Sequence, residues 1–237
     1  MRTLLVLLPL AACATTAAAP RGPAGTWLHP ERRAAITATD ASEFGRPVFG
    51  LALLNPASNR AYVIGPDSRI DALEFDSGRP IFHSATEGQP FAELPGHTLA
   101  VLTRSRQIAL LDGDDGSVLF VSAPTAAPGA DALNLSLHQG QLELSWRFTV
   151  RGNTPCCGGG IELEEGHLAV DLDTGEVRQL PGAPVAAFPK PPANVKLEYL
   201  THPAALRVTA PNGVSWTHRV PEPPPESEKP PKPDPRP

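Results

Sequence analysis

The sequence predicts an all-β domain made of repeated antiparallel hairpins. Apolar and polar residues alternate with a period of two, which is typical of strands, rather than with the helical period of about 3.6. The clearest example is a hairpin that turns at Gln139-Gly140, with alternating apolar positions at Leu133, Leu135, Leu137, Leu142, Leu144, Trp146, Phe148 and Val150. Frequent turns are expected throughout, because the chain holds 29 prolines and 20 glycines, and both residue types interrupt helices.

An internal repeat supports the same fold class. Three segments align without gaps: 72–82, 110–120 and 169–179. Their common form is an apolar residue, an acidic residue, two free positions, a Ser, Thr or Asp, and then a glycine. In such a turn an acidic side chain caps the backbone and glycine takes a positive φ between two strands. We therefore assign a structural, non-catalytic role to the turn residues Asp76, Gly78, Asp112, Gly116, Asp171 and Gly175.

This pattern resembles the blade repeat of quinoprotein-type β-propellers, Ala-Leu-Asp-x-x-Thr-Gly-x-x-x-Trp. The resemblance implies a small or degenerate propeller-like stack of antiparallel meanders. The 194 residues from Trp27 to Val220 allow four or five blades at about 40 residues per blade. Phe82 and Phe120 stand where the family has tryptophan, and Gln179 stands there in the third copy. A β-sandwich is the alternative architecture.

The first residues indicate export and a lipid anchor. An arginine and a short apolar run precede Leu10-Ala11-Ala12-Cys13, as in a secretion signal. The run is shorter than the ~20 residues of a membrane-spanning helix. The four residues resemble the lipobox of bacterial lipoproteins, which implies cleavage before Cys13 and lipidation, palmitate included, at its thiol. Within that family Ala14, in place of aspartate, favours the outer membrane. The alternative is an ordinary secretory signal with a chance cysteine.

Four regions follow from these patterns. We expect a signal peptide at 1–12, the lipidated cysteine with a flexible tether at 13–25, the all-β repeat domain at 26–220, and a proline-rich tail at 221–237. The tail holds nine prolines in 17 residues, a composition typical of a disordered end or of a peptide for a proline-reading groove. The net charge of −5 gives no electrostatic reason to expect nucleic acid.

Cys156 and Cys157 form the second candidate site. They are adjacent and are followed by three glycines. Adjacent Cα atoms lie about 3.8 Å apart, which is less than a disulfide normally spans, so a vicinal disulfide here requires an unusual turn. In an oxidising compartment such a bridge is favoured. Unmodified loop thiols, a redox role and metal binding remain the alternatives.

No other motif points to chemistry. The acidic residues at 112–116 are spaced like part of a calcium loop but lack its distal glutamate, and the seven histidines are scattered. We expect no metal site, no cofactor and no catalytic residues. The leading hypothesis is a lipid-anchored, non-enzymatic envelope protein that binds a protein partner as a scaffold. The alternatives are a small-ligand or metal binder that uses the Cys156–Cys157 loop and, third, a quinone-dependent enzyme.

Overall fold

The computed structural model describes residues 25, 27–37, 46–48, 50–125, 132–151, 161–182 and 192–222. Within these residues the chain forms fifteen strands and one helix, α1 (Pro30–Thr37), so the predicted all-β class is confirmed. The strands are β1 (Arg46–Val48), β2 (Ala52–Asn55), β3 (Arg60–Ile64), β4 (Arg69–Glu74), β5 (Pro80–Leu94), β6 (Thr98–Thr103), β7 (Gln107–Asp112), β8 (Val118–Pro124), β9 (Ala132–His138), β10 (Gln141–Arg151), β11 (Ile161–Asp171), β12 (Val177–Gln179), β13 (Lys196–Thr201), β14 (Ala204–Thr209) and β15 (Ser215–Arg219).

All the strand pairings join neighbours in sequence and are antiparallel, and they form four meanders. The 15-residue strand β5 belongs to two of them. Its first half pairs with β4, for example Ala72 with Phe82, and its second half pairs with β6, for example Leu94 with Thr98. The first meander is thus β1–β4 with the first half of β5, and the second is the rest of β5 with β6–β8. The third meander is β9–β12 and the fourth is β13–β15.

The inner meanders are buried on both faces. In β6, Leu99 and Val101 join a core with residues of β2–β4, whereas Ala100 and Leu102 join a core with residues of β9–β11. This division follows from the strand itself, because successive side chains leave opposite faces of a sheet. Continuous apolar runs in the sequence therefore mark the strands with a neighbouring meander on each side.

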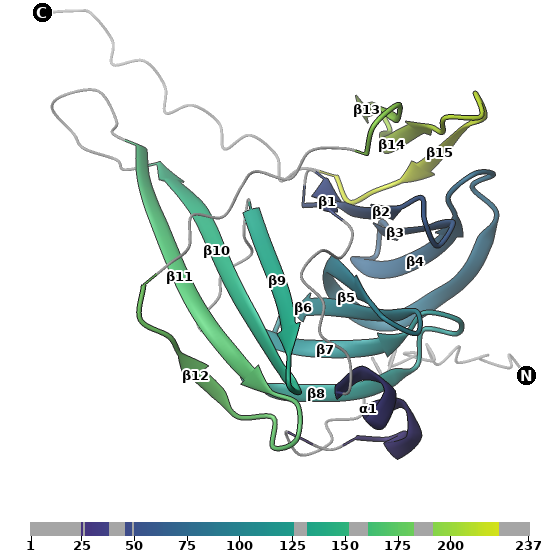
Figure 1. Ribbon diagram of the computed structural model, residues 1–237. Coiled ribbons are helices and arrows are strands. Elements are labelled where there is room, and N and C mark those ends of the chain that lie inside the picture. The colour runs from purple at the N-terminus through teal and green to yellow at the C-terminus, as the bar shows by residue number, and fades with distance from the viewer. Residues whose placement is uncertain are drawn as a thin grey trace, which may run out of the picture.

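The outer meanders have one apolar face only. In β14, Leu206 and Val208 are buried in a core shared with β2 and β3, and Arg207 between them is exposed. In β10, Leu142 and Leu144 are buried, while Glu143 between them is only half-buried. The stacking order is therefore fourth, first, second, third. No hydrophobic cluster of the described residues joins the third meander to the fourth, which lie at the two ends of the stack (Figure 1).

A segment outside the repeats lies across the second and third meanders. The backbone N–H groups of Gly25 and Leu28 donate to the carbonyl oxygens of Val121 and Leu119, at 3.0 and 2.9 Å, and so extend the sheet beyond β8. Helix α1 follows, with proline at its first position, where a missing N–H costs nothing. Its Ile36 is buried in the core between the second and third meanders. Among the described residues, no helix has the length and apolar character needed to cross a membrane.

Candidate functional site

The three repeat turns share one backbone geometry. In each, the glycine N–H donates over 2.8 Å to the carbonyl oxygen of the residue four positions earlier, which is Glu74, Asp112 or Asp171. The glycines have φ values of 70°, 77° and 72°, in the region where a side chain is strained. The acidic position of the first repeat is therefore Glu74. Asp76 lies two positions later, and its N–H donates to Asn59 Oδ1 over 2.9 Å.

The acidic side chains of these turns bind their own backbone. Asp112 Oδ1 accepts from the N–H of Asp114, and Asp171 Oδ1 accepts from the N–H groups of Asp173 and Thr174, at 2.8 to 2.9 Å. Desolvation acts to raise the pKa of Asp171, but these backbone hydrogen bonds outweigh it and lower the pKa. Both residues are thus positioned as caps of tight turns.

The carboxylates of the acidic loop at 112–116 are paired with arginines and backbone N–H groups of the protein. Asp112 Oδ2 lies 2.6 Å from Arg32 Nη2, and Asp114 Oδ1 lies 2.7 Å from Arg60 Nη2. Asp115 Oδ1 accepts from the N–H of Ser117, and hydrogen bonds from Ser117 lower its pKa. Among the described residues, no group of three or more His, Cys, Asp or Glu is arranged to hold a metal ion. Cys13, Cys156 and Cys157 lie outside the described residues.

A side chain from another segment binds the same carbonyl in each repeat, three residues before the glycine. Trp216 Nε1 donates to Phe75 O over 2.8 Å, and Trp27 Nε1 donates to Leu172 O over 2.6 Å. In the second repeat Arg60 Nη1 donates to Gly113 O over 2.6 Å. The turns therefore serve as the docking points between successive parts of the stack.

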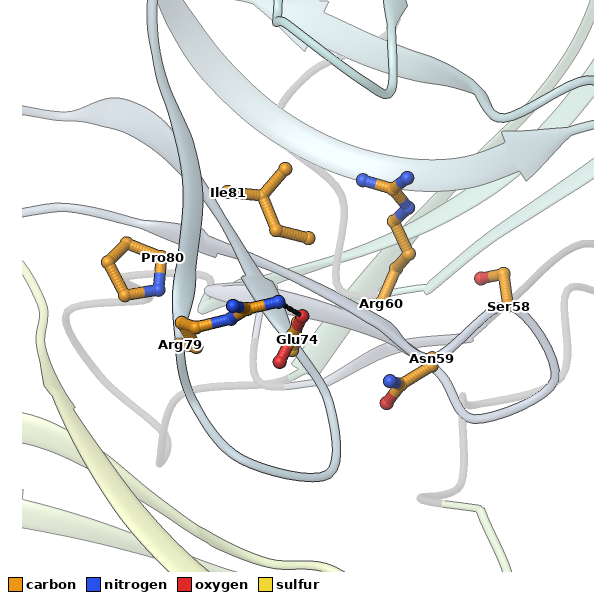
Figure 2. Close-up of a pocket in the computed structure, with 7 residues that line it drawn as sticks. All are labelled: Ser58, Asn59, Arg60, Glu74, Arg79, Pro80 and Ile81. Atoms are coloured by element: carbon orange, nitrogen blue, oxygen red, sulfur yellow. Dashed lines mark hydrogen bonds and ion pairs between the residues drawn. The ribbon is translucent and has the colours of Figure 1, made fainter.

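Between two turns of the first meander lies a cavity of about 360 Å³. Its walls come from the β2–β3 turn, the β4–β5 turn and the adjoining strand ends, and the lining residues are Ser58, Asn59, Arg60, Glu74, Arg79, Pro80 and Ile81. Figure 2 shows the paired side chains of Arg79 and Glu74 on one side of the cavity and Ser58 and Asn59 on the other. The cavity thus offers charged, hydrogen-bonding and apolar groups together.

The charged side chains that line the cavity form ion pairs and hydrogen bonds within the protein. Hydrogen bonds from Arg79 and Ser77 lower the pKa of Glu74, and the Glu74 carboxylate in turn raises the pKa of Arg79. Arg79 is 74% exposed, so its guanidinium remains accessible to a ligand carboxylate. Arg60 is 15% exposed and binds Asp114 and Gly113 O, which fixes it as part of the wall.

Behind this wall is a buried carboxylate. The side chain of Glu93 is 3% exposed, and it accepts from Asn55 Nδ2 at 2.8 Å and from Ser58 Oγ at 2.7 Å. His97 Nδ1 lies 3.1 Å from its other oxygen. Burial, and then the charge of Glu93, raise the pKa of neighbouring Tyr62. Because Ser58 both lines the cavity and binds Glu93, the network fixes the position of the β2–β3 turn.

Sequence reasoning missed the cavity residues. The predicted turn residues Asp76 and Gly78 lie in the turn that forms one wall, but the lining side chains are the flanking Glu74 and Arg79. The opposite wall contains Asn59, which has φ 55° and ends the turn that starts at Pro56. The local sequence signal for this turn is an asparagine after Pro-Ala-Ser, because asparagine tolerates a positive φ.

Comparison with known proteins finds similarity at the level of solved structures. No protein-family model matches the sequence, and no curated protein matches it. Among solved structures, the crystal structure of BamB from Moraxella catarrhalis is similar, with 15% sequence identity and a TM-score of 0.28. The alignment covers 68% of this chain and 58% of that chain, so this chain spans less than two thirds of BamB.

Proposed function

We propose that this protein is a lipid-anchored, non-enzymatic scaffold of the bacterial cell envelope that binds a protein partner. The observation that carries the proposal is the cavity between the β2–β3 and β4–β5 turns. Its accessible guanidinium, its ionised Glu74 and its apolar Ile81 and Pro80 suit a short polar segment of a partner, with a carboxylate toward Arg79 and an N–H toward Glu74.

The support of the cavity favours binding over catalysis. The carboxylates nearby are engaged in hydrogen bonds. Glu93 accepts from Asn55 and Ser58, and Glu74 accepts from Ser77 and Arg79. Such groups hold a surface in one shape, and a rigid surface binds with little loss of conformational entropy. The cavity is therefore proposed as a preformed docking site.

The membrane attachment is proposed from the sequence. Leu10-Ala11-Ala12-Cys13 has the form of a lipobox, and several acyl chains on Cys13 give much stronger attachment than one chain, which binds only marginally. Ala14 favours the outer membrane within that family. Replacing Cys13 with Ala should abolish labelling by palmitate and move the protein out of the membrane pellet. An unlabelled wild type that still sediments with membranes contradicts the anchor.

Site-specific crosslinking tests the docking site. A photoreactive residue at Ile81, inside the cavity, should give a discrete protein adduct in intact cells, whereas one at exposed Arg207, on the outer face of the fourth meander, should not. Arg79→Ala should remove the adduct and leave the unfolding temperature unchanged, because Arg79 is largely exposed. No adduct at Ile81, or one that persists in Arg79→Ala, contradicts this docking site.

A further inference from the structure

The junction between the fourth and first meanders contains a cluster of histidines and carboxylates that none of the motifs indicated. His218 of β15 reaches across the junction, and its Nε2 lies 2.8 Å from Asp71 Oδ2 of β4. His83 of β5 stands opposite Asp71 in the sheet, and its Nδ1 lies 2.6 Å from Asp71 Oδ1. The Asp71 side chain is only 15% exposed. One carboxylate thus joins two histidines from different strands.

The second nitrogen of His83 also faces a carboxylate. Its Nε2 lies 3.3 Å from Asp67 Oδ2, in the turn before β4. A neutral imidazole has one donor and one acceptor nitrogen, so it can donate to only one of two carboxylates, whereas an imidazolium donates to both. The placement of both nitrogens of His83 against carboxylates therefore suits the protonated ring.

Few other charges face this cluster from the described residues around it. Arg69 Nε lies 3.7 Å from Asp67 Oδ2. On β5, Glu87 lies opposite Arg69 and is paired with Arg104 of the β6–β7 turn over 3.0 Å. On β14 the nearby ionisable side chain, Arg207, is exposed on the other face and binds Glu198. Asp71 therefore has the two histidines as its potential cationic partners.

We propose that the fourth meander is docked in a proton-dependent way, through His218 on Asp71, a carboxylate that His83 holds from within the first meander. Free histidine changes its charge near pH ~6.5. With the His218 ring protonated and Asp71 ionised, their contact is a charge-assisted hydrogen bond across the junction, and such a bond is roughly twice as strong as one between neutral groups. A neutral His218 ring leaves only the weaker kind of contact.

The cluster is coupled to the candidate docking site through the strand that carries it. Two residues before His218 on β15, Trp216 covers Gly78 and binds Phe75 O. Gly78 and Phe75 belong to the β4–β5 turn, which also provides Glu74 and Arg79 to the cavity. Weaker docking of the fourth meander at higher pH therefore weakens the support of one cavity wall.

Hydrogen exchange of the full chain tests the proposal without any partner, so its result is independent of the proposed function. Between pH 5.5 and 8.0, after correction for intrinsic exchange, protection of β14–β15 should fall roughly twofold to fivefold, as expected for one partly exposed ion pair. Protection of β10–β11 should change much less. Measurement in EDTA excludes bound metal as the cause.

Glutamine variants provide the control. His83→Gln with His218→Gln keeps a hydrogen-bond donor at each position but cannot become charged, so the protection of β14–β15 should lose its pH dependence. His29→Gln removes a histidine that pairs with Glu31 away from this junction, and should behave like the wild type. If the double variant fails to fold, His218→Gln alone, which changes the contact across the junction, should reduce the pH dependence. Equal protection at both pH values in the wild type, or an unchanged pH dependence in the glutamine variants, overturns the proposal.

Discussion

Two tryptophans from opposite ends of the chain make the same contact at two different junctions. Trp216 of β15 binds Phe75 O and holds the fourth meander on the first. Trp27 precedes all the strands, and it binds the equivalent Leu172 O of the third repeat. Trp27 also packs against Phe120, with ring centroids 5.2 Å apart. The indole donor and the carbonyl acceptor are the same, although the partners are 141 residues apart in one case and 145 in the other.

The comparison shows which part of the repeat is fixed and which part is exchangeable. The turn, with its glycine and its outward carbonyl, is the same in three copies. The side chain that packs on the turn differs. Trp216 lies over Gly78, and Phe82 lies over Gly116 while Arg60 binds the carbonyl. In the third repeat Trp27 binds the carbonyl of the Gly175 turn. A turn that offers an unsatisfied carbonyl requires a donor, because a buried polar group without a partner is costly, but any nearby segment can supply it.

Removal of Trp216 should have the largest effect on stability. The side chain is 8% exposed and belongs to the core between the fourth and first meanders. Trp216→Ala should lower the free energy of unfolding by about 3–5 kcal/mol, since it leaves a cavity in a core. Denaturant unfolding measures this directly. Trp27→Ala should cost less, because Trp27 is only partly buried; equal losses in the two variants would show that the junctions are equivalent.

Alanine at Gly78 should come next in size. A Cβ at Gly78 lies 2.5 Å from Trp216 Cβ, so the substitution adds steric overlap to an unfavourable φ. Gly213 provides the matched control, because it has φ +85° and nothing within 4 Å of its Cβ position. Gly213→Ala should lower the free energy of unfolding only by the cost of placing alanine at a positive φ, about 1–2 kcal/mol. Gly78→Ala should lower it by about 1–3 kcal/mol more, because of the steric overlap. Similar unfolding midpoints for the two variants would contradict tight docking of Trp216.

Phenylalanine at position 27 isolates the hydrogen bond of the N-terminal segment. Trp27→Phe keeps an aromatic ring beside Phe120 but removes the donor to Leu172 O. The loss should be about 1–2 kcal/mol, the cost of an unsatisfied carbonyl that is not fully buried. A thermal melt of this variant beside Trp216→Phe compares the two bonds. The idea of a shared docking contact fails if neither variant is destabilised.

The smallest expected effect concerns the turn beneath Trp27 and depends on pH. Backbone hydrogen bonds lower the pKa of Asp171 despite the opposing effect of desolvation. A lowered pKa in the folded state means that the cap stabilises the fold above the unfolded pKa, near ~3.9, and loses this effect as the pH falls through the folded value. Asp171→Ala should therefore melt earlier than the wild type at pH 7, and the difference should shrink in acid. A difference that is constant from pH 7 to pH 2.5 excludes a role for the charge.

The sequence predicted the class of fold because its signals are local. Apolar and polar residues alternate around Leu142 and Leu144 because one face of the strand is buried and the other faces solvent. The turn glycines are recognisable because the turn requires a positive φ. The first turn has two acidic residues, Glu74 and Asp76, and the prediction chose Asp76. The gapless alignment places Glu74 beside Asp112 and Asp171, and the hydrogen bond from Gly78 to Glu74 O agrees with the alignment. The cavity and the histidine cluster lay beyond sequence reasoning, since His218 and Asp71 are 147 residues apart and no spacing rule connects them.

Strand β5 has a consequence for how the protein folds. It is the last strand of one meander and the first strand of the next, so neither meander can open without disturbing the other. The two should therefore unfold as a single cooperative unit. Their pairings join strands adjacent in sequence, and such local contacts form early and quickly. The β1–β8 sheet is expected to act as the folding nucleus, on which the third meander, the fourth meander and the N-terminal segment then assemble.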